Sequence, residues 1–259
     1  MNTQTPISYF AKIGYSARGV IYLIIGSLAL MIALGLGGKQ TNAKGAISTL
    51  LEQPFGWFFL ILFIVGLFSY SGWRFYQAIF DPDEHGYSVK GLMVRLGLFG
   101  SMISHALLGY WASKLAIGLK SAEDKNVSVA NWLGEDYAVA ILGVFSLVTA
   151  IIGVSHLVKA LKAKFDDYME IPENHRIWIL PLCKTGLISR GIAWLILSLL
   201  FLQSALITKD HSIKGMQDVL TAVSEDTLFG DWLLSALALG LVSFGIYSFL
   251  EAIYRKIEF

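Results

Sequence analysis

Three arginines recur at one position of a short repeated phrase, and they are the side chains best suited to chemistry in this chain. The phrase Gly-x-x-x-Arg occurs clearly twice, ending at Arg18 and Arg190, and more faintly a third time, ending at Arg95. Each copy opens a long apolar segment. A guanidinium has a planar fork of N–H donors that suits phosphate or carboxylate oxygens. Three such groups at one depth would bind an anion, and in a membrane the most available anion is a lipid head group.

The same arginines also have a purely structural interpretation. An arginine at the end of an apolar helix can extend its guanidinium to the head groups as an anchor. It can equally pair with a carboxylate, for which Glu251 is a candidate. The sequence therefore leaves two roles open for these three residues, ligand of an anion or lipid and structural anchor.

Two histidines, His105 and His156, lie within apolar segments. A facing pair of membrane histidines could ligate haem or a metal ion, or relay protons. Their depths disagree, however, and neither segment holds a Cys, Asp or Glu beside them. The pattern favours hydrogen-bonded helix packing, so the sequence predicts no catalytic residue, no metal site and no cofactor.

Known chemical motifs do not stand out elsewhere. The chain has no phosphate loop, dinucleotide fingerprint, zinc-ligand spacing or nucleophile elbow. Its basic residues fall in short separate segments rather than in a stripe, which argues against a nucleic acid partner. The acidic turn Asp81–Gly86 lacks the calcium-loop pattern and is interpreted as a tight polar turn.

The elements that must position these residues are membrane helices. The 259 residues are 55% hydrophobic and only 15% charged, with a mean hydropathy of +0.61. Six stretches contain no Asp, Glu, Lys or Arg, and each is long enough at about 1.5 Å per residue to span most of a ~30 Å hydrocarbon core. These stretches are Gly19–Gly38, Phe55–Trp73, Leu96–Ser113, Tyr137–Val158, Gly191–Thr208 and Trp232–Leu250.

The repeated phrase divides the chain into three units, residues 12–80, 88–161 and 184–255, within one membrane domain, 1–259. Two crossings per unit return the chain to the same side, so the units must be parallel repeats about an axis normal to the membrane. We therefore predict an all-α membrane protein, with six transmembrane helices as three parallel two-helix repeats in a pseudo-threefold bundle.

Short amphipathic helices are predicted on the outer face, between the two helices of a unit. Apolar residues follow a helical stripe after Lys44, the segment from Lys214 resembles it, and Val127–Leu133 is a weaker third version. On the inner side, the charged stretch 162–181 contains Pro172 and Pro181 and is predicted to be a flexible linker.

Charge distribution predicts the orientation. With the N-terminus in the cytoplasm, the inner segments hold nearly twice as many lysines and arginines as the outer loops. We expect a multi-pass protein of the bacterial inner membrane with both termini cytoplasmic. The first apolar run is too long for a signal peptide and its phrase recurs near residue 190, so it is interpreted as a retained helix.

Several of these features resemble one bacterial family of three-repeat integral membrane proteins, domain of unknown function 1206. The resemblance is carried by the Gly-x-x-x-Arg-Gly opening, the outer Lys-Gly-Ala segment, the Pro-Phe-Gly helix start and the Tyr-x-x-Trp-Arg ending: Gly14, Arg18, Gly19, Gly45, Pro54, Gly56, Tyr70, Trp73 and Arg74. It covers nearly the whole chain, and unit 88–161 departs furthest. The resemblance implies six transmembrane helices in three pairs and no established activity.

The sequence thus limits the possible functions to a few without identifying one. The leading hypothesis is a non-enzymatic membrane protein that binds membrane lipids, including anionic head groups at the cytoplasmic side, or an unknown protein partner. The alternative is a channel or carrier for a small solute or anion along the pseudo-threefold axis. A membrane enzyme or redox component using His105 and His156 is the third hypothesis.

Overall fold

The computed structural model describes residues 6–37, 41–118, 128, 130–207, 212–225 and 230–256, which fold mainly into α-helices. Its six long helices are α1 (Pro6–Ala33), α3 (Gly56–Phe80), α4 (Val89–Ala116), α6 (Glu135–Leu161), α7 (Arg176–Leu206) and α9 (Gly230–Tyr254). Each contains a stretch long and apolar enough to cross a membrane. The prediction of an all-α protein with six transmembrane-length helices is confirmed.

The outer surface of these helices is strongly apolar. Phe58, Leu107, Leu199 and Leu239 are each more than half exposed, and they come from four different long helices. A water-soluble fold avoids large contiguous apolar surfaces, whereas hydrocarbon solvates them. This surface fits a protein whose helices are surrounded by lipid.

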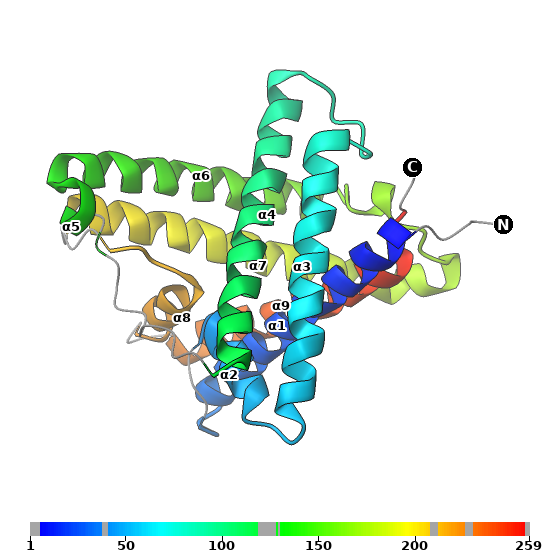
Figure 1. Cartoon of the computed structure of the whole chain (residues 1–259), viewed down its shortest axis with the longest axis horizontal. Coiled ribbons are helices and arrows are strands. Elements are labelled where there is room, and N and C mark those ends of the chain that lie inside the picture. Colours follow the sequence, from blue (N-terminus) through cyan, green and yellow to red (C-terminus); the bar gives the residue numbers. More distant parts are fainter. Residues whose placement is uncertain are drawn as a thin grey trace.

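The long helices pack as three close pairs: α1 with α9, α3 with α4, and α6 with α7 (Figure 1). Smaller contacts join α1 to α3 and α7 to α9. Among the described residues, α4 and α6 do not contact each other extensively. The main partner of each helix therefore comes from a different predicted unit, not from its own.

Glycines allow the helices of these pairs to approach closely. A side-chain carbon at Gly245 of α9 would lie 3.0 Å from the carbonyl oxygen of Gly19 in α1. The α6–α7 pair has a matching contact, because a side-chain carbon at Gly191 would lie 3.0 Å from the carbonyl oxygen of Gly153. Such close backbone contact supplies van der Waals attraction between helices in lipid, where the hydrophobic effect does not.

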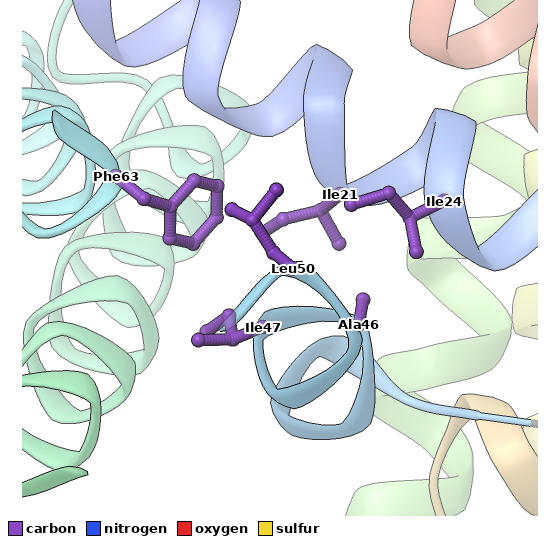
Figure 2. A pocket seen from close by; sticks show the side chains of 6 residues that line it. All are labelled: Ile21, Ile24, Ala46, Ile47, Leu50 and Phe63. Carbon is purple, nitrogen blue, oxygen red and sulfur yellow. The ribbon is translucent and has the colours of Figure 1, made fainter. Parts of the chain in front are cut away.

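Two short helices, α2 (Ala43–Leu51) and α8 (Met216–Ser224), lie between the helices of the first and last units. Asn42 caps α2 by accepting a hydrogen bond from the amide of Gly45 at 3.1 Å. Figure 2 shows the apolar face of α2 turned toward α1 and α3, with Ala46, Ile47 and Leu50 beside Ile21, Ile24 and Phe63. The space left between these side chains admits no water.

The middle unit has only the short helix α5 (Ala130–Leu133) at the corresponding place. Val127 and Val129 of the predicted segment lie outside the described residues. The amphipathic helices predicted near residues 44 and 214 thus form, and the third version is one turn long within the described part.

The prediction of a flexible linker over residues 162–181 is wrong. Two 3₁₀ turns, Asp166–Tyr168 and Glu173–His175, occupy its first part, and α7 begins at Arg176. Pro181 lies inside α7, where its missing N–H removes one backbone hydrogen bond without ending the helix. The segment is ordered because Phe165, Met169 and Ile171 are buried against α7 and α9.

Candidate functional site

Arg18 of α1 is buried, and each nitrogen of its guanidinium has a partner. Its Nε donates to the Ser248 hydroxyl at 3.0 Å, and its Nη1 donates to the Tyr70 hydroxyl at 2.7 Å. Its Nη2 forms an ion pair with Glu251 of α9. The guanidinium also lies 5.0 Å from the ring centre of Tyr15. Arg18 therefore has one of the structural roles considered from the sequence, pairing with Glu251.

The partners of Arg18 belong to a larger hydrogen-bonded circuit. Arg74 of α3 donates to the Tyr70 hydroxyl and, at 2.7 Å, to Oε1 of Gln77. Gln77 in turn donates to Oδ2 of Asp83 at 2.6 Å. This half of the circuit runs from α1 along the end of α3 into the turn that follows it.

Arg255 closes the circuit from the end of α9. Its Nη2 donates to both oxygens of Asp83 at 3.0 Å, and its Nη1 lies 3.5 Å from Oε1 of Glu251. Burial alone lowers the pKa of Arg255, but the neighbouring Tyr15, Asp83 and Glu251 side chains outweigh it and the pKa is raised. Three guanidiniums and two carboxylates are thus held together, and they fix α1, α3 and α9 relative to one another.

Arg95 of α4 has a different role, at the end of α3. Its Nε donates to the carbonyl oxygen of Ala78 at 2.8 Å, and its Nη2 donates to that of Ile79 at 2.7 Å. Its Nη1 lies 3.9 Å from Oδ2 of Asp81. A cation suits the last carbonyls of a helix, which carry its partial negative charge. Arg95 therefore joins α4 to α3 as a cap.

Asp81 organises the turn next to this cap. Its oxygens accept hydrogen bonds from the amides of His85 at 2.9 Å and Gly86 at 2.7 Å. Burial raises the pKa of Asp81, but these two amides and the Arg95 guanidinium outweigh it, so the pKa lies below its ordinary value. The predicted polar turn is thus held by an ionised carboxylate.

Arg190 of α7 has aromatic neighbours in place of acidic ones. Its guanidinium carbon lies 4.5 Å from the ring centres of both Tyr22 and Phe244, and 5.6 Å from that of Trp194. Within the described part of the chain, its buried Nη1 has no hydrogen-bond partner. Arg18 also lies near Phe244, at 5.2 Å. The structure therefore brings Arg18 and Arg190 to one aromatic ring, and leaves Arg95 elsewhere.

A cavity of about 1120 Å³ extends from these two arginines between α1, α4 and α7, with α2 and α8 completing its lining. Three levels follow from the positions along the helices. Arg18, Arg190 and His105 line one end; apolar side chains such as Ile25, Leu108 and Leu200 line the middle; and Lys44, Lys214 and Asp218 line the other end. The cavity is basic at the arginine level, apolar in the middle and charged at the other end.

The two histidines are bonded within their own helices. Nδ1 of His105 donates to the carbonyl oxygen of Ser101 at 2.7 Å, and Nδ1 of His156 donates to that of Ile152 at 2.8 Å. A carbonyl can only accept, so Nδ1 carries the proton in each ring and Nε2 is the remaining nitrogen. Across the described residues, no three His, Cys, Asp or Glu side chains are placed to hold a metal ion.

Trp194 is the site residue that sequence analysis did not single out. It lines the cavity, and its buried Nε1 has no hydrogen-bond partner among the described residues. The signal was present in the repeated phrase, because Trp194 follows Arg190 by four residues. That spacing puts two side chains on one face of a helix.

Comparison with known proteins agrees with the sequence resemblance. A family described as Domain of Unknown Function (DUF1206) matches residues 13–81 and 185–255. The chain belongs to this family. The two DUF1206 matches coincide with the first and last units, and they leave out the middle unit, in which Leu96 stands where the others have Gly19 and Gly191.

A relative from Bacillus subtilis (strain 168), described as "Uncharacterized protein YxxB", is 26% identical over 260 residues, which covers 98% of this chain and 93% of the relative. The similarity therefore includes the middle unit. No solved structure matches the chain. The DUF1206 assignment gives the family and leaves the activity to be inferred from the site.

Proposed function

We propose that this protein is a non-enzymatic, multi-pass protein of the bacterial inner membrane that binds a membrane lipid in the cavity between α1, α4 and α7. The observation that carries the proposal is the cavity itself. Its volume, about 1120 Å³, is at or above the ~300–1,000 Å³ usual for small-molecule sites. Basic side chains at one end and apolar walls in the middle match the two halves of an anionic amphiphile.

Access to the cavity also favours a lipid. The helices α4 and α7 both line it, yet they are not an extensively contacting pair within the described residues. Only 6% of the most apolar stretch of α4 is buried within the protein, against 56% in α9. An acyl chain could therefore enter from the bilayer beside α4 without passing through water.

We further infer that the three units are repeats related by a pseudo-threefold axis, with both termini in the cytoplasm. Each close helix pair joins the second helix of one unit to the first helix of the next, in the cyclic order α9–α1, α3–α4 and α6–α7. The matching contacts of Gly19 with Gly245 and of Gly191 with Gly153 support one shared register. The lysine and arginine distribution supports the orientation.

Lipid binding in the cavity is tested by a substitution that fills the cavity. Leu200 lines the cavity, whereas its neighbour Leu199 is 64% exposed on the outer surface of the same helix. We expect Leu200→Trp to lower the amount of co-purifying phospholipid severalfold, as measured by native mass spectrometry in mild detergent. Leu199→Trp should retain as much lipid as the wild type. Equal retention by all three proteins would contradict lipid binding in the cavity.

A second candidate is a carrier or channel for a small anion. It is favoured by the polar and charged side chains at the end of the cavity away from the arginines, including Lys44, Gln203 and Lys214. This function predicts anion flux into proteoliposomes that Leu200→Trp reduces. Absence of flux above protein-free vesicles would exclude it and leave the lipid-binding proposal standing.

A further inference from the structure

The three arginines differ in whether their charge is already satisfied, and this difference identifies the charged end of the site. We propose that Arg190 and Trp194 bind the phosphate group of an anionic phospholipid, an inference that rests on the cavity being a lipid site. The shared chemistry is a tetrahedral oxyanion, and the lipid is the source that the cavity favours.

Two unpaired donors belong to neighbouring side chains of α7 at the arginine end of the cavity. Nη1 of Arg190 and Nε1 of Trp194 are both buried and have no hydrogen-bond partner in the described part of the chain. They lie one helical turn apart on α7, and both residues line the cavity. Buried donors in proteins are nearly always paired. Among the buried side-chain donors without a partner in the described part of the chain, only these two belong to residues that line the cavity, so one bound acceptor could pair both.

Aromatic rings position the Arg190 guanidinium. Tyr22 from α1 and Phe244 from α9 each lie 4.5 Å from its central carbon, and Trp194 lies 5.6 Å away. Aromatic faces attract the cation but accept no conventional hydrogen bond from its N–H groups. The donors of the fork are consequently left for an oxyanion.

The counter-ion of Arg18 has no equivalent beside Arg190. Gly19, next to Arg18, packs against Gly245 and Phe249, and Gly191, next to Arg190, packs in the same way against Gly153 and Leu157. In this shared register, two residues beyond Phe249 is Glu251, which pairs with Arg18.

Lys159 follows Leu157 by two residues, so in the α6–α7 pair a lysine occupies the position that Glu251 occupies in the α1–α9 pair. The carboxylate of Glu251 is already engaged by Arg18 and Arg255. Arg190 has no ion pair with a described acidic residue, and the local charge is therefore positive. A bound anion would supply the charge that Glu251 supplies in the other interface.

The walls beyond the two donors favour a lipid over free phosphate. Leu108 of α4 and Leu200 of α7 line the cavity beyond the arginine level, as do Ile21 and Ile25 of α1. A free phosphate ion gains nothing from such walls, whereas the acyl chains of a phospholipid bury apolar surface there.

The test compares variants that remove one feature each. Arg190→Gln removes the charge and the fork, and Trp194→Phe keeps an aromatic, though smaller, side chain but removes the Nε1 donor. Arg176→Gln is the control, since Arg176 pairs with Asp166 and Glu173 away from the cavity. Each full-length protein is equilibrated with vesicles of equal parts phosphatidylglycerol and phosphatidylcholine, re-purified, and its bound lipids are counted by native mass spectrometry.

We expect Arg190→Gln to lower bound phosphatidylglycerol about tenfold or more, as loss of a charge-assisted hydrogen bond predicts. Trp194→Phe should lower it severalfold, and phosphatidylcholine should change little in either variant. Arg176→Gln should match the wild type. Because Trp194→Phe keeps an aromatic side chain at this position, it keeps the test valid if Arg190→Gln unfolds.

Each outcome bears on a different part of the inference. Unchanged phosphatidylglycerol in both variants, with lipid still lost in Leu200→Trp, would overturn the roles of Arg190 and Trp194 and leave the cavity as the lipid site. Lipid bound neither by the wild type nor by any variant would overturn the proposed function itself. A parallel titration of the delipidated protein with inorganic phosphate, followed by tryptophan fluorescence, separates the sources: saturation that depends on Arg190, without lipid retention, would overturn the phospholipid assignment.

Discussion

Arg18, Arg95 and Arg190 occupy the same place in their repeated phrases, yet each guanidinium balances its charge differently. Arg18 pairs with Glu251, Arg95 caps carbonyl groups at the end of α3, and Arg190 lies between aromatic rings. Each arginine has the same N–H donors, but the neighbouring helix determines which groups those donors contact. Equal spacing in a sequence therefore does not imply equal chemistry in the fold.

The carboxylate of Glu251 is the residue on which the buried circuit depends most. It accepts from Arg18 and Arg255, and it is 3% exposed. Glu251→Gln keeps the shape but leaves two buried guanidiniums without this negative charge. Removing one partner of a buried ion pair costs about 3–5 kcal/mol, so we expect a clearly lower unfolding temperature in detergent.

Glu52→Gln is the matched control, because Glu52 is exposed at the end of α2 and should unfold as the wild type does. A double variant, Arg18→Gln with Glu251→Gln, should be less destabilised than the sum of the two single variants. Strict additivity would contradict the direct pairing of the two residues.

At the scale of the helices, the sequence predicted the positions and lengths of the long helices but not which helices pack against each other. Charge-free stretches predicted all six long helices, because the cost of burying charges in hydrocarbon excludes them from a span. The pairs α1–α9, α3–α4 and α6–α7 were not predicted, since a glycine shows that something approaches closely without saying which helix it is. The bond from Arg18 to Ser248 joins residues 230 positions apart, and no local pattern reports such a contact.

The same limit explains the wrong prediction at residues 162–181. Charged residues and two prolines are typical of a linker, and they dominate the local composition. The burial of Phe165, Met169 and Ile171 depends on α7 and α9, which are brought there only by the fold. For the site, the arginine positions were predictable from the phrase, whereas the missing counter-ion of Arg190 required the helix pairing.

Glycine packing at this scale is tested by adding one methyl group. A side-chain carbon at Gly186 would lie 2.6 Å from the backbone nitrogen of Phe244 in α9, and backbone atoms there cannot move aside cheaply. We expect Gly186→Ala to destabilise the protein by about 1–3 kcal/mol. At Gly143 of α6 nothing lies within 4 Å, so Gly143→Ala should be neutral or stabilise by up to about 1 kcal/mol.

Thermal unfolding of both variants in the same detergent is the measurement. Equal unfolding temperatures for Gly186→Ala and Gly143→Ala would mean that α7 and α9 are not in close backbone contact. Because both substitutions have the same chemistry, a difference between them reports packing and not helix propensity.

For the whole molecule, the number of crossings determines which segments share a side of the membrane. If all six long helices cross, the 3₁₀ turns between α6 and α7 lie on the side of both chain ends, and α2 and α8 lie on the opposite side. The short helices complete the cavity lining at the end away from Arg190. The orientation of the protein in the membrane therefore determines which leaflet supplies the lipid head group, and we expect it to be the inner leaflet.

Cysteine labelling tests this orientation. Cys183 is the single cysteine and is buried, so Cys183→Ser provides an unreactive background. Glu52→Cys places a thiol at the exposed end of α2, and Lys162→Cys places one at the exposed end of α6. With a membrane-impermeant maleimide, we expect labelling of Glu52→Cys in spheroplasts and of Lys162→Cys only in inverted membrane vesicles. The reverse pattern would mean that the protein has the opposite orientation and that the Arg190 site lies in the outer leaflet. Labelling of both cysteines from the same side would contradict the predicted number of membrane crossings.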